Sequence, residues 1–75
     1  MTVTVKMIGP FIYAAGFSEK AFDLPAGTTA GGLMDLVNLE KSRPRIVTRN
    51  GRAVAPDDTL EDGDRVVMSP LYSGG

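Results

Sequence analysis

The first residues of the chain alternate between apolar and polar side chains. In residues 2–9, Val3, Val5 and Met7 fall on one side of an extended chain, while the threonines and a lysine fall on the other. A period of two is typical of a strand with one buried face. The pattern therefore predicts a half-buried strand at the start of the protein.

A second apolar segment returns to the same spacing. Residues 17–24 place Phe22 and Leu24 two positions apart, which predicts a second strand. The connection, residues 10–16, is bracketed by proline and glycine, so we expect a loop there despite its apolar side chains. The two strands are expected to form an antiparallel hairpin with a long apolar connection.

A helix is expected after this hairpin. Residues 25–29 form a turn in which a threonine can cap the helix that follows. In residues 30–39, Leu33, Leu36 and Val37 recur at helical spacing and are expected to face the sheet. Each glycine of the pair in the first turn costs about 1 kcal/mol of helix stability relative to alanine. The pair indicates either close backbone packing or a frayed first turn, and we expect packing.

A second hairpin is the clearest local pattern in the chain. Asn50 and Gly51 stand between two extended runs, as in a two-residue type I′ turn, whose central residues both need positive φ. We therefore expect strands near residues 45–49 and 52–55.

The last strand follows an acidic turn. Residues 57–64 carry five carboxylates around Leu60, which is the expected buried anchor of the turn. Residues 65–69 are the expected final strand. Pro70 ends it, because proline cannot donate a hydrogen bond to a sheet ladder.

Two strands, a helix, two short strands and a final strand predict an α+β fold. The helical crossover allows the final strand to lie in the middle of the sheet, parallel to the first. This arrangement is the ubiquitin-like β-grasp, a mixed sheet of four to five strands with one main helix across it. We expect one β-grasp domain over residues 1–70 and a flexible C-terminal tail over residues 71–75.

Composition removes many kinds of chemistry. The 75 residues include no cysteine and no histidine, so they offer no disulfide, thiolate, iron–sulfur ligand or imidazole base. The acidic turn lacks the spacing of an EF-hand loop, so no metal site is expected. A chain this short buries only about 60% of its unfolded surface, which leaves little room for a catalytic cleft. The C-terminal carboxylate becomes a candidate reactive group by elimination.

Charge and hydropathy set expectations for location and partners. The net charge is −1 and no apolar run approaches the ~20 residues of a membrane span. Met1 leads straight into a strand pattern without a signal peptide, so we expect a cytoplasmic protein with no membrane partner. The basic residues between positions 41 and 52 are not interleaved with aromatic side chains, so no nucleic-acid partner is expected.

The two glycines at the end of the tail have two possible interpretations. Gly74 and Gly75 have no side chain to pack into a core, so they can be a frayed end. Alternatively, the lack of a Cβ lets the tail enter a narrow channel in another protein. When extended, residues 70–75 reach at most about 20 Å.

Taken together, these features resemble a known family. The matching segments are FDLPAGTTAGGLMDLV (residues 22–37), NGRAV (residues 50–54), LEDGDRVVMSP (residues 60–70) and SGG (residues 73–75). Their order is similar to that of the small ubiquitin-like sulfur carriers, which include the small subunit of molybdopterin synthase and the thiazole-pathway carrier. The long first hairpin looks more like the molybdopterin-synthase subunit.

The resemblance implies a function. In these carriers a ubiquitin-activating-type enzyme uses ATP and Mg²⁺ to adenylate the C-terminal carboxylate. A sulfur donor, such as a desulfurase or rhodanese, then displaces AMP and leaves a thiocarboxylate. For this chain the resemblance implies that Gly75 is modified, that Ser73 and Gly74 thread into the partner, and that the protein has no catalytic residue or bound cofactor of its own. The large subunit of molybdopterin synthase is a further expected partner.

Tail entry alone is a weak basis for recognition, because ordering each residue costs about 1–2 kcal/mol of backbone entropy. We therefore predict that Leu71 and Tyr72 anchor the tail on the partner. Capping of the sheet edge is the alternative role for these two side chains.

The folded body is expected to dock as well. On the last strand we predict that Val67 lies on the face opposite the helix, with Val66 and Met68 beneath the helix. Together with Phe11 or Ile12 from the first connection, Val67 is predicted to form an apolar docking patch with a charged rim. If the register were reversed, Val66 and Met68 would be the docking residues.

Other functions share the same tail. Carriers for tungsten cofactor, thiamine thiazole, tRNA thiolation or cysteine synthesis have the same skeleton. A ubiquitin-like protein modifier would use the same adenylate to join Gly75 to a lysine amine of a target. A non-covalent β-grasp interaction module is a further alternative.

Overall fold

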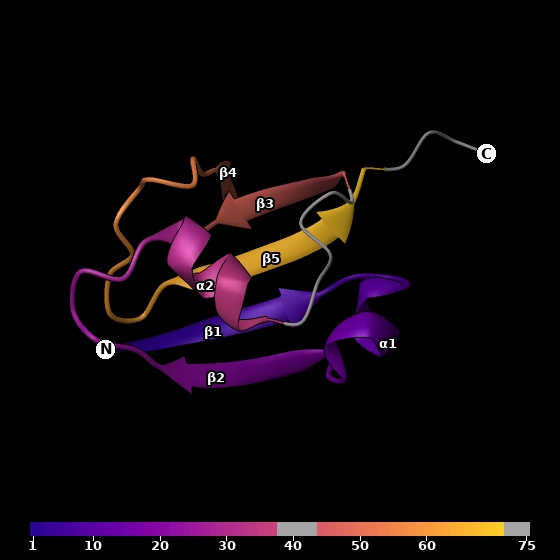
Figure 1. Ribbon diagram of the computed structural model, residues 1–75, viewed down its shortest axis with the longest axis horizontal. Coiled ribbons are helices and arrows are strands. Elements are labelled where there is room, and N and C mark those ends of the chain that lie inside the picture. Colours follow the sequence, from indigo (N-terminus) through magenta and orange to yellow (C-terminus); the bar gives the residue numbers. More distant parts are fainter. Residues whose placement is uncertain (38–43, 72–75) are drawn as a thin grey trace.

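Figure 1 shows a sheet with one helix lying across a single face. The structure is a computed structural model, and it describes residues 1–37 and 44–71. In chain order its elements are β1 (Thr2–Met7), α1 (Phe11–Ala15), β2 (Glu19–Asp23), α2 (Ala30–Leu36), β3 (Arg45–Arg49), β4 (Arg52–Ala53) and β5 (Arg65–Pro70).

β5 is the central strand of the sheet. The five strands lie in the order β2-β1-β5-β3-β4, with β5 parallel to β1 and antiparallel to β3. The parallel pairing is possible because α2 and the β3–β4 hairpin carry the chain back between β1 and β5. A mixed five-stranded sheet with one main helix across it confirms the predicted α+β, ubiquitin-like β-grasp fold.

The core lies between the sheet and α2. Val3, Val5 and Met7 are at most 1% exposed, as the alternation predicted, and Val66 and Met68 beside them are 0% exposed. Burying one side chain of this size contributes about 1.5–3 kcal/mol. The two central strands therefore supply a large part of the folding free energy.

The connection between β1 and β2 is helical, so the prediction of a loop over residues 10–16 is wrong. α1 follows Gly9, which has a φ of +59°, and ends at Gly16, which is left-handed. The N–H of Gly16 donates to the carbonyl of Ile12 at 2.9 Å, and Phe11 is fully buried. A segment this short shows no helical period in the sequence, and the burial of Phe11 holds the turn against the core.

α2 begins at the predicted cap. The Oγ1 of Thr29 accepts a hydrogen bond from the N–H of Gly32 at 3.1 Å. Leu33 and Val37 are buried as expected, whereas Leu36 is 59% exposed, so the prediction that Leu36 faces the sheet is wrong. The helix ends at Leu36 and Val37 is extended, which leaves Leu36 on the flank of a short helix. No helix in the described parts of the chain is long and apolar enough to cross a bilayer.

Gly31 packs directly against the backbone of Pro56. Its N–H donates to the Pro56 carbonyl oxygen at 2.7 Å, and a Cβ on Gly31 would lie 3.0 Å from that oxygen. This contact confirms the predicted close packing for Gly31. At Gly32 the nearest atom to such a Cβ is 3.5 Å away, so that position is not comparably constrained.

The second hairpin has the predicted turn. Asn50 and Gly51 have φ values of +52° and +84°, so both central residues are in the positive-φ region that the type I′ turn requires. β3 covers the predicted residues, whereas β4 contains only Arg52–Ala53 and is shorter than predicted.

Asp64 joins the acidic turn to this hairpin. It is 7% exposed, and its carboxylate accepts hydrogen bonds from Asn50 Nδ2 at 2.9 Å and from the N–H of Glu61 at 2.8 Å. The Nε of Arg49 lies 3.8 Å from the same carboxylate. Leu60 is 2% exposed, which confirms it as the buried anchor of the turn. These contacts fix the direction in which the chain enters β5.

We expect Asp64→Ala to lower the free energy of unfolding by about 2–4 kcal/mol, because two donors lose their acceptor in a buried site. Urea unfolding followed by circular dichroism measures the change. Asp57→Ala removes an exposed carboxylate from the same turn and should change the free energy by about 0.5 kcal/mol or less. Equal losses in the two variants would contradict the role assigned to Asp64.

Candidate functional site

The C-terminal end of the central strand β5 is where the described chain ends. Leu71 follows Pro70, donates its N–H to the Pro44 carbonyl at 3.2 Å, and has a side chain that is 59% exposed. We call this end of the molecule, marked by Pro70 and Leu71, the tail end; Figure 1 shows α1 at the same end. The tail predictions concern residues outside the described ranges: Tyr72, Ser73, Gly74 and Gly75.

The residues of β5 alternate between the two faces of the sheet. Val66 and Met68 are fully buried on the α2 side, and Val67 is half-buried on the other face, which is the predicted register. On this outer face Val67 lies between Thr48 of β3 and Lys6 of β1. Val67 is therefore available on the face that no described helix covers.

Two isoleucines extend this apolar surface toward the tail end. Ile46 is the β3 partner of Ser69, and Ile8 lies on the β1 side, where its N–H donates to the Met68 carbonyl at 3.0 Å. The Ile46 residue is 45% exposed and Ile8 is 39% exposed. We define the outer patch by its four apolar members: Ile8, Ile46, Val67 and Leu71.

Charged side chains border the outer patch. The Nη2 of Arg65 lies 2.8 Å from the Oε1 of Glu19, and both side chains are about half exposed. An exposed ion pair of this kind contributes only about 0–1 kcal/mol to stability. Lys6, beside Val67, adds another positive charge. An apolar centre with a charged rim is typical of a protein–protein interface.

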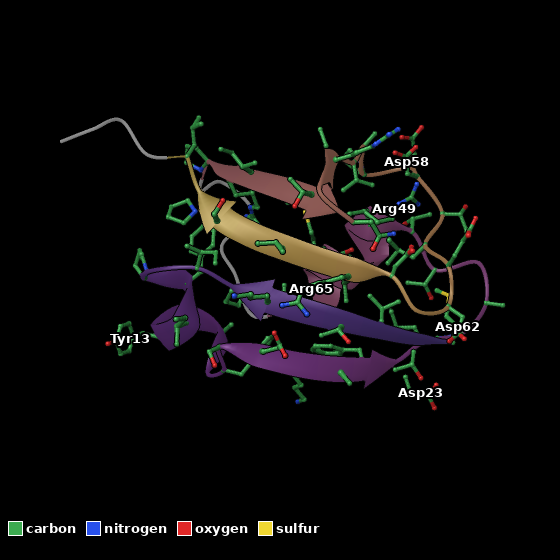
Figure 2. The ribbon with its side chains drawn as sticks, turned by 180° about the vertical axis from the view of Figure 1, so that it is seen from behind. Tyr13, Asp23, Arg49, Asp58, Asp62 and Arg65 are labelled. Atoms are coloured by element: carbon green, nitrogen blue, oxygen red, sulfur yellow. The ribbon has the colours of Figure 1, made fainter. Side chains whose placement is uncertain are left out.

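Phe11 does not belong to this surface. It is 0% exposed and anchors α1 in the core, so the prediction that Phe11 contacts a partner is wrong. Ile12, the alternative, is half-buried and packs against the core. The exposed side chain of the segment is Tyr13, at 88%, and Figure 2 shows it pointing away from the sheet.

Sequence reasoning missed three exposed apolar side chains near the tail end. Ile8 and Ile46 could have been predicted from the alternation of the strands. Each is next in sequence to an inward-facing residue, Met7 or Val47, and therefore faces outward. Tyr13 carried no such pattern, because its segment was expected to be a loop. Identifying its outward direction requires the helical geometry of α1.

Metal-binding side chains are not clustered in the described residues. These residues hold no group of three or more histidine, cysteine, aspartate or glutamate side chains that could bind a metal ion. A cavity of about 660 Å³ opens between α2 and β3, where Thr29, Asp35 and Arg45 provide its polar side chains. The Thr29 hydroxyl already accepts the capping hydrogen bond of α2.

Two comparisons with solved structures describe the fold. SAMP1 from Haloferax volcanii is 23% identical, with a TM-score of 0.83 over 100% of both chains. A complex of subunits 1 and 2 of the molybdopterin-converting factor from Helicobacter pylori contains a chain that is 17% identical, with a TM-score of 0.70 over 100% of both chains. Both likenesses show a shared fold.

A third structure and a family model extend the similarity to sequence. The putative molybdopterin converting factor subunit 1 from Pyrococcus furiosus is 27% identical, with a TM-score of 0.85, covering 96% of this chain and 99% of that one. Comparison with curated proteins gives no match. The ThiS family model matches residues 5–75. Because this match covers nearly the whole sequence, the chain belongs to the ThiS family of small ubiquitin-like sulfur carriers.

Proposed function

We propose that this protein is a cytoplasmic sulfur carrier for molybdopterin biosynthesis, activated at the carboxylate of Gly75 by an ATP-dependent adenylating enzyme. The observation that carries the proposal is the ThiS match, which extends through the Gly-Gly end. The similarity to the Pyrococcus molybdopterin converting factor subunit supports the choice of pathway.

The chemistry requires only a carboxylate from this chain. A free α-carboxyl group has a reference pKa near 3.5, so it is an anionic nucleophile at neutral pH. Its oxygen attacks the α-phosphorus of ATP and displaces pyrophosphate. The terminal sulfur of a persulfide on the donor, a desulfurase or rhodanese, then attacks the carbonyl carbon of the mixed anhydride, and AMP leaves. A thiol reduces the resulting acyl disulfide, which releases the thiocarboxylate and forms a new disulfide on the donor side. The activating enzyme supplies Mg²⁺ and the groups that hold the phosphates.

The tail residues let the terminal carboxylate reach the active site of that enzyme. Gly74 and Gly75 lack a Cβ and can follow a narrow channel, and Ser73 is a small polar spacer before them. Leu71 and Tyr72 anchor the tail at the mouth of the channel. The outer patch, with Val67 at its centre, docks the folded body so that the tail is aimed correctly.

The large subunit of molybdopterin synthase is the partner that receives the sulfur. The Helicobacter relative was solved as a complex of subunits 1 and 2 of the molybdopterin-converting factor, which supports a partner of this kind. The activating enzyme and the synthase subunit both need the tail, so we propose that they use the outer patch in turn.

Intact-mass spectrometry tests the carrier function directly. After incubation with an adenylating enzyme, ATP and a sulfur donor, one oxygen of the protein should be replaced by sulfur, and fragmentation should locate the change at Gly75. A reaction without ATP is the control. Only unmodified carboxylate, under conditions that thiolate a known carrier, would refute the proposal.

A protein modifier is the second candidate. Haloferax SAMP1, whose fold this chain shares, is named a small archaeal modifier protein. A modifier uses the same adenylate, but a lysine amine of the target attacks the carbonyl and forms an isopeptide bond. Peptides in which Gly75 is joined to a lysine side chain of another protein would establish this function.

A further inference from the structure

Large exposed apolar side chains gather toward the tail end. Ile8, Ile46 and Leu71 lie beside the last residues of β5, and Tyr13 projects from α1 at the same end. In Figure 2 the labelled carboxylates Asp23, Asp58 and Asp62 lie at the opposite end from Tyr13. The molecule therefore has an apolar end, from which the tail leaves, and an opposite end that carries these carboxylates together with Arg49.

α1 holds Tyr13 on a fixed support. Phe11 is fully buried, the N–H of Tyr13 donates to the Pro10 carbonyl at 3.2 Å, and Gly16 closes the helix. The helix contains no charged residue. An aromatic side chain on a fixed backbone has few rotatable bonds, so it loses little conformational entropy when a partner binds it.

Tyr13 has no evident role within the folded domain. It is 88% exposed, and within residues 1–37 and 44–71 its side chain has no hydrogen-bond or ring partner. Its phenol ring contributes little to the core. A single exposed tyrosine is ordinary on a protein surface, so its position relative to the tail decides its significance.

The length of the tail restricts where a partner can sit. Residues 72–75 follow Leu71 and can extend at most about 14 Å. If Gly75 reacts in the active site of an adenylating enzyme, that site must come within this distance of Leu71. A protein surface at such a distance must approach the tail end closely, and α1 lies at that end.

We propose that Tyr13 is an aromatic anchor for the adenylating enzyme. The inference rests on the proposed activation of Gly75. Ile8 joins α1 to the outer patch, so one partner surface can contact both. Because α1 has no charged residue, we expect it to bind an apolar, uncharged pocket on the enzyme. The pocket should leave the phenol hydroxyl of Tyr13 in contact with water. Tyrosine is enriched among the residues that dominate interface energetics.

Adenylation kinetics test this role, followed as ATP–pyrophosphate exchange with the purified cognate adenylating enzyme. Tyr13→Ala should raise the KM for the carrier about tenfold and leave kcat within about twofold, because the contact acts in docking. Tyr13→Phe should keep the KM within about threefold, because the ring supplies the contact. Asp57→Ala, at the acidic turn, is the control and should leave both constants unchanged.

The outcomes separate this inference from the proposed function. If the wild-type protein is never adenylated, the proposed function fails and the anchor fails with it. If wild type is adenylated and Tyr13→Ala has the same KM, or Tyr13→Phe is as impaired as Tyr13→Ala, the anchor alone is overturned. If Tyr13→Ala changes the self-association of the carrier and not its KM, Tyr13 contacts a second copy of the chain. That result would also overturn the proposed contact with the adenylating enzyme.

A crosslinking measurement guards against a folding defect in the alanine variant. Benzoylphenylalanine introduced in place of Tyr13 should form a photocrosslink to the adenylating enzyme. The same group introduced in place of Asp57 should not. Failure of the first crosslink with a folded carrier that is still adenylated would overturn the inference.

Discussion

Deletion of Gly74 and Gly75 is expected to abolish adenylation and thiocarboxylate formation while leaving the melting temperature almost unchanged. The deletion moves the terminal carboxylate onto Ser73 and shortens the reach of the tail by about 7 Å. Changes at exposed positions away from packed groups usually alter stability by about 0.5 kcal/mol or less. Thermal unfolding and ATP–pyrophosphate exchange on the same preparation measure the two effects.

A matched variant separates the position of the carboxylate from the presence of the glycines. Addition of one alanine after Gly75 keeps both glycines but places the carboxylate on a residue with a Cβ, and it should also abolish adenylation. A marked fall in the melting temperature of the truncated protein would show that the glycines pack against the body. That result is incompatible with a tail that threads into a partner.

Val67→Asp is expected to raise the KM for adenylation at least tenfold while lowering the free energy of unfolding by only about 1 kcal/mol. In the free protein the new carboxylate lies on the outer face next to Lys6, which offsets part of its cost. In the complex it would be buried against an apolar partner surface, where an unpaired charge costs several kcal/mol. Exchange kinetics and urea unfolding provide the comparison.

Ala21→Asp is the matched control for this substitution. Ala21 is exposed on β2 at the edge of the sheet, so the variant adds the same charge outside the outer patch. Its KM should stay within about twofold of wild type, because the new charge lies outside the surface that is proposed to dock the enzyme. Equal KM values for Val67→Asp and Ala21→Asp would show that the outer patch does not dock the enzyme.

The sheet could be predicted from sequence because its information is local. Val3, Val5 and Met7 alternate over enough residues to define a buried face, and the Asn50-Gly51 turn fixes the second hairpin by its need for positive φ. The central place of the last strand followed from topology, since a helical crossover permits parallel pairing with the first strand.

The two helices were predicted less well, for physical reasons. α1 is too short to display a helical period, and its stability comes from burial of Phe11, which is a tertiary contact. In α2 the helical spacing of Leu33, Leu36 and Val37 predicted three inward residues, but the helix ends at Leu36, and of these three only Leu33 and Val37 are buried. Periodicity gives the direction of a face and not the residue at which a helix stops.

The candidate site was predicted in part. The alternation of β5 allowed two registers, and the prediction that Val67 lies on the outer face is confirmed, because Val66 and Met68 are buried. The contribution of the first connection was assigned to Phe11 or Ile12, whereas Tyr13 is the exposed residue. Composition alone does not distinguish an aromatic side chain that anchors a helix from one that the helix presents to solvent.

The central position of β5 also has a consequence for how the protein is made. The β1–β2 and β3–β4 hairpins belong to one sheet only through β5, and an isolated hairpin is marginally stable in water. Pairing Val5 with Val66 closes a loop across most of the sequence, which places this step late in folding. A nascent chain therefore lacks an ordered sheet until its final strand has been synthesised and inserted. An enzyme that recognises both the body and the tail would for this reason bypass incomplete or misfolded chains.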